Sequence, residues 1–225
     1  NLHYKMIQKV KDFKNLDVTI PILKSDGVFI VENFIQGDVL NNLRDEVMKK
    51  CSNSKNYEFG KLYRGKPLIS YGKNSSISQV FNQKWMKDLN DAYDEGMGYG
   101  SSVIATHDYV TTSKWARQGW LHFDKQKSFK FFLYLTDVDS TCGSLTLSPK
   151  SHKEGSRLRK SMVNSGKYES ERKLEETHKE YIEKYPFESV EGKSGTLIIF
   201  DTDTFHKGGV VEKNKERLII RLHNK

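Results

Sequence analysis

The stretch that decides the fold is residues 195–223, GTLIIFDTDTFHKGGVVEKNKERLIIRLH. Two runs of β-forming residues flank a segment that contains His206 and the turn-forming pair Gly208-Gly209. Apolar runs of this length, bounded by Gly, Asp and Asn, predict short buried strands joined by turns. Runs with the same texture begin at residue 101: SSVIATHDYVTT, GWLHFD, FKFFLYLTDV and GSLTLS. This half of the chain therefore predicts a β sandwich or barrel.

The N-terminal half has a helical pattern instead. Residues 26–34, DGVFIVENF, predict one short buried strand, and a helix follows it with Asp38 as its N-cap. A second helix is predicted over residues 84–95, where apolar side chains recur at helical spacing. Helices that precede a run of strands indicate an α+β protein that is mainly β.

A charged segment, residues 153–190, interrupts the strands. Within it, residues 171–185 predict a helix, because Leu174, His178 and Tyr181 recur on one face. Insertions of this length are often lids or binding loops, and a solvated surface helix is the equal alternative. We predict a single domain over residues 1–225, with residues 153–190 as a candidate lid.

Composition narrows the class of protein. With 225 residues, 36% hydrophobic and 12% aromatic, the chain has enough apolar material for a folded core. The net charge of +8 favours a Lys-rich solvated surface or a cationic mouth for an anionic substrate. A nucleic-acid partner is not expected, because no stacking motif or zinc-finger spacing accompanies the charge.

The same composition bears on location. No apolar run approaches a membrane span, and the first residues lack the apolar stretch of a secretory signal. Cys51 and Cys142 form no CxxC motif and are interpreted as free thiols in a reducing compartment. We therefore expect a cytoplasmic protein without a membrane partner. The oligomeric state stays open.

The pattern H-x-[D/E] occurs three times: at His122/Asp124, His152/Glu154 and His178/Glu180. Residues i and i+2 point to the same face of a strand, so such a pair can chelate a metal there. The third pair lies in the predicted helix, where i and i+2 diverge by about 200°. The second follows a proline in a polar stretch, and only the first pair, in GWLHFD, alternates as a strand does.

His206 supplies a third ligand from far along the chain, after a strong strand signal. Two histidines and one carboxylate on one side of a metal, with other positions open, suit non-haem Fe(II) oxygenases. Arg217 and Arg221 lie on the following strand, and a guanidinium binds a carboxylate such as the distal one of 2-oxoglutarate in a bidentate fork. His223 is the alternative third ligand, but no arginine follows it.

With these residues, the chain resembles the phytanoyl-CoA dioxygenase family of Fe(II)/2-oxoglutarate oxygenases over nearly its whole length. Residues 26–35, DGVFIVENFI, look like the family's opening, and GWLHFD is similar to its H-x-D strand. Residues 142–153, CGSLTLSPKSHK, resemble the family segment that ends in a P-G-S-H turn. Arg217, eleven residues after His206, matches the family's 2-oxoglutarate arginine and is preferred to Arg221 for that reason.

The resemblance implies a cupin-like jelly roll, a double-stranded β-helix with the N-terminal helices packed on one sheet. It implies Fe(II) held by His122, Asp124 and His206, with 2-oxoglutarate anchored by Arg217. The implied reaction is hydroxylation of a small organic substrate by O₂, with release of succinate and CO₂. Related halogenases replace the carboxylate ligand, so Asp124 favours hydroxylation over halogenation, while desaturation and ring chemistry stay open.

Departures from the family pattern concern two positions. Gly208 stands where relatives often carry a Ser or Thr that helps hold 2-oxoglutarate. Tyr109, Thr111 and Tyr134 are the candidates to supply that contact. Lys150 stands where the family usually has Gly, which affects only a turn.

Three alternatives stay open. A cupin-like protein can bind a metal or small ligand without catalysis, and zinc on the same three ligands can serve a hydrolase, which has no need of the arginine. The third is an oxygenase that modifies nucleic acid. The substrate is not predicted, although the positive charge favours an anionic one. Candidate residues for the mouth of the site are Arg64, Trp120, Arg157 and Arg159.

Overall fold

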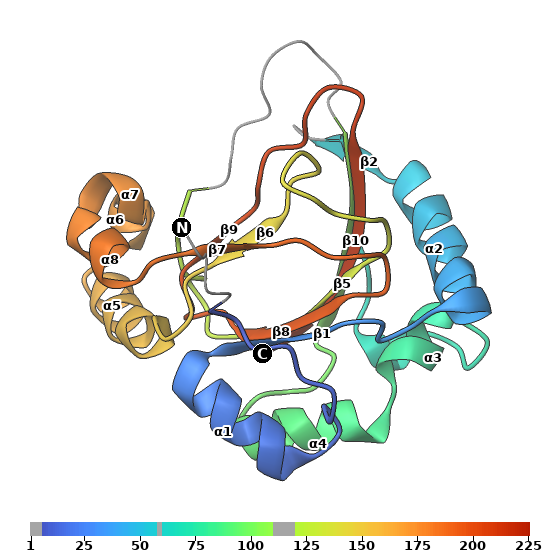
Figure 1. The fold of residues 1–225 in the computed structure, drawn as a ribbon, viewed down its shortest axis with the longest axis horizontal. Helices are drawn as coiled ribbons and strands as arrows, with labels where there is room; N and C mark the ends of the chain where they lie inside the picture. The colour runs from blue at the N-terminus through green and yellow to red at the C-terminus, as the bar shows by residue number, and fades with distance from the viewer. Residues whose placement is uncertain (1–5, 58–59, 110–119) are drawn as a thin grey trace.

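The computed structural model describes residues 6–57, 60–109 and 120–225, in which two antiparallel sheets face each other (Figure 1). The large sheet has seven strands in the order β1-β8-β5-β10-β4-β3-β2, and the small sheet has three in the order β7-β6-β9. The α+β jelly roll is thus confirmed, without a closed barrel. The strands are β1 (Val28–Val31), β2 (Lys55–Tyr57), β3 (Gly60–Arg64), β4 (Ser102–Tyr109), β5 (Phe129–Tyr134), β6 (Leu145–Leu147), β7 (Glu188–Val190), β8 (Leu197–Asp201), β9 (His206–Lys207) and β10 (Glu216–Asn224).

The N-terminal helices cover the outer face of the large sheet, as predicted (Figure 1). They are α1 (Leu16–Asp26), α2 (Gly37–Ser52), α3 (Ser76–Phe81) and α4 (Lys84–Tyr93), with a short 3₁₀ turn, η1 (Leu68–Ser70), between α2 and α3. Alternate residues of β10 point outward, so Leu218, Ile220 and Leu222 join one apolar cluster with Leu43 and Val47 of α2. Each such buried side chain stabilises the fold by about 1.5–3 kcal/mol.

Two helix predictions need correction. The N-cap of α2 is Gln36, and Asp38 lies in the first turn, where its charge complements the helix dipole. Helix α1 was not predicted, and Pro21 interrupts its hydrogen-bond ladder. Its N-cap Asn15 accepts a hydrogen bond from the backbone of Asp17, and its burial against the core outweighs the proline.

The insertion folds into short helices instead of one long one: α5 (His152–Asn164), α6 (Tyr168–Glu171), α7 (Leu174–Thr177) and α8 (Lys179–Lys184). The single helix predicted over residues 171–185 is wrong, because the backbone N–H of Leu174 donates to the carbonyl of Leu121 instead of continuing a helix. Of its predicted apolar face, Leu174 is buried with Leu121, Phe123 and Phe205, and Tyr181 packs partly buried against the same cluster. Figure 1 shows α5–α8 grouped on the far side of the sheets from α2 and α3.

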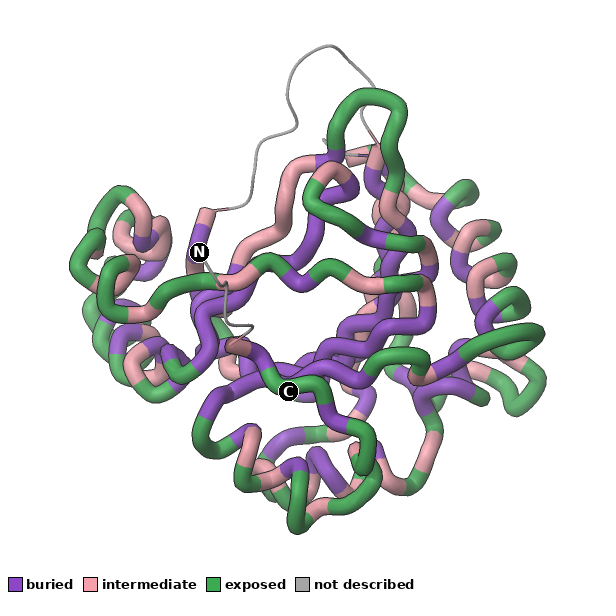
Figure 2. The backbone as a smooth tube through the Cα atoms, viewed as in Figure 1, coloured by how far each residue is buried: buried purple, intermediate pink, exposed green. Residues whose placement is uncertain are grey.

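Burial follows this layered plan (Figure 2). Buried residues are concentrated in the strands, while exposed residues occupy loops and the outer sides of helices. Cys51 and Cys142 are both free and buried, as expected. Within the described ranges, no helix combines the length and apolar composition that a membrane crossing requires.

Candidate metal centre

The segment that carries His122 lies directly opposite β9, which carries His206. The two residues exchange backbone hydrogen bonds of 3.0 and 2.8 Å as an isolated antiparallel bridge. Asp124 continues the segment and donates its backbone N–H to Thr202 at 3.1 Å. Over its described residues, 120–124, the predicted strand is reduced to a single bridge at His122, and His122 and Asp124 still point to the same side.

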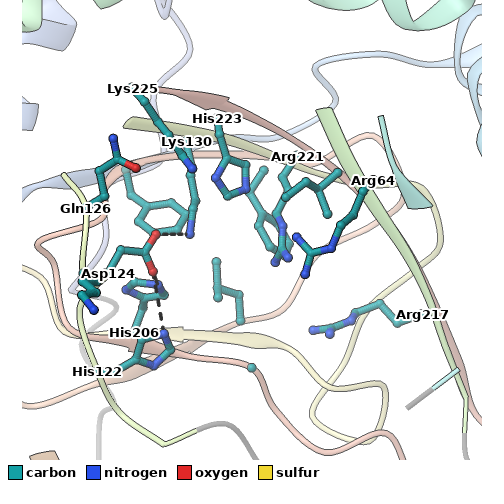
Figure 3. A pocket seen from close by; sticks show the side chains of 16 residues that line it. Arg64, His122, Asp124, Gln126, Lys130, His206, Arg217, Arg221, His223 and Lys225 are labelled. Atoms are coloured by element: carbon teal, nitrogen blue, oxygen red, sulfur yellow. Dashed lines mark ion pairs between the residues drawn. The ribbon is translucent and has the colours of Figure 1, made fainter. Parts of the chain in front are cut away.

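The structure brings the three predicted ligands together. One ligand atom each from His122, Asp124 and His206 lies within 4.8 Å of the others. Asp124 Oδ1 lies 3.8 Å from His122 Nε2 and 3.5 Å from His206 Nε2 (Figure 3). Among the described residues, no other such group of His, Cys, Asp and Glu side chains occurs.

The orientation of both imidazoles is fixed by backbone carbonyls. Nδ1 of His122 lies 2.6 Å from the Trp120 carbonyl, and Nδ1 of His206 lies 2.7 Å from that of Thr204. A carbonyl only accepts, so each Nδ1 carries the proton and each Nε2 presents its lone pair to the shared volume. Two imidazole nitrogens and a carboxylate oxygen that converge in this way fit a divalent first-row metal such as Fe(II).

The charges around the three side chains favour the ligating forms. Burial opposes ionisation of Asp124, but the charge of Lys130 outweighs it and holds the pKa of Asp124 well below its usual range. Lys130 Nζ lies 2.7 Å from Asp124 Oδ2, which leaves Oδ1 toward the histidines. Burial, reinforced by His206, lowers the pKa of His122 to about 3, so its ring is neutral.

The other H-x-[D/E] pairs have different roles. His152 is buried beneath Gly27, and its Nε2 lies 3.2 Å from the Lys24 carbonyl. His178 lies at the break between α7 and α8, with its Nδ1 3.5 Å from Glu180. The two side chains do face each other, contrary to the expectation from one continuous helix. Glu171 lies 3.8 Å from the opposite ring nitrogen, Nε2, so His178, Glu180 and Glu171 do not converge on one point.

A cavity of about 410 Å³ adjoins the three side chains (Figure 3). Figure 3 shows His122, Asp124 and His206 on one wall and Arg64, Arg217 and Arg221 on the opposite one. Among the described residues, six cationic side chains and one side-chain carboxylate line it: Arg64, Lys125, Lys130, Arg217, Arg221 and Lys225, with Asp124. The cavity is thus strongly cationic, in agreement with the predicted cationic mouth.

Arg217 is held rigidly on that wall. Its Nε and Nη2 lie 2.9 and 2.5 Å from Asp108 Oδ2, and its Nη1 donates to the Gly143 carbonyl. These bonds use three of its five N–H groups, so two remain for a ligand. Asp108 in turn accepts hydrogen bonds from Tyr57 and Thr106.

Gly208 also lines the cavity, and a Cβ there would meet nothing within 4 Å. Tyr109, Thr111 and Tyr134 were the candidates to supply the 2-oxoglutarate contact that a side chain here would make, and they lie in different places. Tyr134 donates to the Val190 carbonyl and accepts from the Leu145 N–H, which ties the two sheets together. Tyr109 lies on the face of β4 opposite to Asp108. Neither is among the lining residues, so their contact with 2-oxoglutarate stays a prediction, and Thr111 lies outside the described residues.

Of the four candidates for the mouth, Arg64 lines the cavity. The other three are occupied elsewhere: Trp120 carries Lys173 over its ring at 4.0 Å, Arg157 pairs with Glu154, and Arg159 pairs with Asp203.

Lys130, whose Nζ contacts Asp124, was not among the site residues predicted from the sequence. Its side chain is 7% exposed. The signal was a lysine within the apolar strand FKFFLYL, because a charge there requires a buried partner.

The comparisons with known proteins agree with this geometry. The chain matches the family model described as Phytanoyl-CoA dioxygenase (PhyH) over residues 23–218. No curated protein sequence matches it. Solved structures are similar in fold at low sequence identity. The epimerase SnoN from nogalamycin biosynthesis, in complex with Fe³⁺, α-ketoglutarate and nogalamycin RO, has a TM-score of 0.67 at 11% identity, over 93% of this chain and 82% of that one.

Two further structures extend the likeness. EctD from S. alaskensis, with 2-oxoglutarate and 5-hydroxyectoine, has a TM-score of 0.67 at 12% identity, over 98% of this chain and 79% of that one. The α-ketoglutarate-dependent carbocyclase SnoK from nogalamycin biosynthesis has a TM-score of 0.65 at 13% identity, over 91% and 81%. These similarities establish the fold, and the family model covers most of the chain. The chain therefore belongs to the phytanoyl-CoA dioxygenase family.

Proposed function

We propose that this protein is an Fe(II)- and 2-oxoglutarate-dependent dioxygenase whose iron ligands are His122, Asp124 and His206. The observation that carries the proposal is the convergence of two Nε2 atoms and one Oδ1 atom at the wall of a cavity. Family membership supports it, and so do the Fe³⁺ and α-ketoglutarate named for SnoN and the 2-oxoglutarate named for EctD. Zinc in a hydrolase would explain the three ligands but not a fixed arginine across the cavity.

Each residue of the site has a distinct task. Bound Fe(II) and 2-oxoglutarate supply the activation of O₂ and the oxidising power, with succinate and CO₂ as products. Arg217 binds the distal carboxylate of 2-oxoglutarate with its two remaining N–H groups, and Asp108 keeps the guanidinium in place. Lys130 holds Asp124 Oδ2, so that Oδ1 is directed at the metal.

We propose hydroxylation of a small organic substrate as the reaction. The carboxylate of Asp124 supports this choice over halogenation, for which that ligand would be a small residue. A cavity of about 410 Å³ suits a small molecule. SnoN is named an epimerase and SnoK a carbocyclase, so proteins of this fold perform other reactions as well. We also propose that residues 1–225 form a single domain, in which the insertion, residues 153–190, is a candidate lid.

The test is an anaerobic titration of Fe(II)-loaded protein with 2-oxoglutarate, followed through the weak visible metal-to-ligand charge-transfer band. We expect the band in the wild type and in His107→Ala, whose imidazole pairs with Glu216 outside the cavity, but not in His122→Ala. Succinate release in air, with candidate substrates, then separates catalysis from binding. Absence of the band from folded, iron-loaded wild type would sink the proposal. A band without succinate release would favour a non-catalytic binding protein.

A further inference from the structure

Arg221 projects from β10 into the cavity, on the wall opposite the three candidate ligands (Figure 3). Its Nε atom is buried without a hydrogen-bond partner, and no described residue forms an ion pair with it. Arg217, on the same face of the strand, is by contrast held by Asp108 and Gly143. Residues i and i+4 of a strand stand about 13 Å apart, so the two arginines serve different parts of the cavity.

Arg64 stands in the same row of the sheet as Arg221. Both residues lie directly opposite Ile104 of β4, one on β3 and the other on β10. Their backbones are therefore roughly 10 Å apart, within reach of each other through two long side chains. Arg64 likewise has no acidic partner among the described residues. Two cations in one row repel each other unless an anion lies between them.

His223 adds a second unsatisfied nitrogen to this wall. It lies two residues after Arg221 on the same strand face, lines the cavity, and has a buried Nε2 without a partner. Buried polar atoms in folded proteins are nearly always hydrogen-bonded. Two such atoms side by side, with a second guanidinium beside them, indicate a place for a ligand that carries oxygen atoms.

The charges that remain unpaired in the cavity indicate what kind of further ligand can bind there. Fe(II) and the dianion 2-oxoglutarate cancel each other, Lys130 cancels Asp124, and Asp108 cancels Arg217. Lys125 lies 3.6 Å from Glu169, so Arg64, Arg221 and Lys225 are the lining cations of the described residues that keep their charges after the cofactors are bound. A guanidinium fork matches the oxygens of a carboxylate or a phosphate.

We propose that Arg221, with Arg64 and His223, forms a subsite for an anionic group of the substrate, either a carboxylate or a phosphate. The inference rests on the proposed function, because it assigns the distal carboxylate of 2-oxoglutarate to Arg217. It narrows the substrate to a small organic acid or phosphate ester, whose oxidised carbon lies between this subsite and the metal.

The test uses two probes, acetate and inorganic phosphate, titrated by calorimetry into protein loaded anaerobically with Fe(II) and saturating 2-oxoglutarate. Arg221→Met should weaken binding of the preferred probe by about tenfold or more, and Arg64→Met, at the rim, by less. Arg157→Met is the matched control, because this exposed arginine pairs with Glu154 outside the cavity, and should change nothing. The affinity for 2-oxoglutarate, read from the charge-transfer band, should change less than about twofold in all three variants. The tighter probe tells a carboxylate subsite from a phosphate one.

The remaining outcomes separate this inference from the function on which it rests. Absence of probe binding to the wild type, or full binding to a folded Arg221→Met, would overturn it. Loss of the 2-oxoglutarate band in that variant would assign Arg221 to the cofactor and overturn it as well. If the wild type forms no band, the proposed function fails, while the same probes on the iron-free protein still decide the subsite. If Arg221→Met does not fold, the same probe titrations on Arg221→Lys and on the exposed Arg64→Met decide whether the subsite exists.

Discussion

The two faces of the large sheet differ in chemistry although the same strands build both. The outer face is apolar and packs on the N-terminal helices, whereas the inner face carries charges around the cavity. On β10 the two sets alternate residue by residue: Leu218, Ile220 and Leu222 face the helices, and Arg217, Arg221 and His223 face the cavity. Because successive side chains of a strand point to opposite faces, one set of β10 side chains stabilises the fold and the other lines the cavity. Substitutions on the two faces should therefore have separable effects.

The strongest expected effect lies at the cavity. His122→Ala should abolish 2-oxoglutarate turnover, with a loss greater than the roughly 100-fold that outer partners of a metal ligand cost. The thermal unfolding midpoint of the metal-free protein should change little, because this side chain is 25% exposed. Succinate release and a thermal melt on the same sample check both halves of the prediction. Retained turnover would mean that His122 does not hold the metal.

The outer face should show the reverse pattern. Leu222→Ala leaves a void in the apolar cluster between the large sheet and the N-terminal helices and should cost about 2–5 kcal/mol of folding free energy. The affinity of the folded fraction for Fe(II) and 2-oxoglutarate should stay as in the wild type. Chemical denaturation and the charge-transfer titration measure the two quantities. A large fall in affinity at full folding would mean that the two faces are coupled.

A matched pair of lysines sharpens the comparison. Lys130 pairs with Asp124 inside the cavity, and Lys127 pairs with Asp94 on the surface. Lys130→Met should weaken Fe(II) binding by about 10–100-fold, because Asp124 loses the partner that orients it. Lys127→Met should leave metal binding unchanged and cost at most about 1 kcal/mol of stability, as exposed ion pairs do. Equal metal affinities in the two variants would remove the proposed role of Lys130.

The smallest expected effect is a change in pH dependence. Burial, with Lys130 and Arg221 nearby, lowers the pKa of His223 to about 2 from 6.5. Between pH 6.5 and pH 2, His223 is protonated in the unfolded chain but neutral in the folded protein. The free energy of unfolding therefore falls as the pH decreases from 6.5 toward 2. The loss is up to about 1.4 kcal/mol per pH unit. His223→Gln should reduce the difference in unfolding free energy between pH 7 and pH 5, measured by chemical denaturation at the two pH values, and an unchanged difference would contradict this assignment.

Much of the site could be predicted from sequence because its signals are local. His122 and Asp124 stand two apart in an alternating run, and His206 follows the apolar run LIIF. The partner of Arg217 could not be predicted, since Asp108 is 109 residues away and only the sheet register places it opposite. The lack of an acidic partner for Arg221 could not be predicted for the same reason, because it depends on which side chains of the neighbouring strands lie beside Arg221.

The insertion was the least predictable part of the fold. Its apolar spacing indicated one helix, and that spacing does mark the buried face. The breaks come from contacts with distant residues, such as the hydrogen bond from Leu174 to Leu121. Helices this short depend on tertiary packing more than on local propensity, so sequence periodicity alone does not locate their ends.

The most direct test of the metal centre is a crystal structure grown anaerobically with Fe(II) and 2-oxoglutarate, with the iron located by its anomalous scattering. We predict iron bonded to Nε2 of His122, Oδ1 of Asp124 and Nε2 of His206, with the distal carboxylate of 2-oxoglutarate on Arg217. Iron bound elsewhere, or these three side chains without iron in protein that has taken it up, would contradict the account.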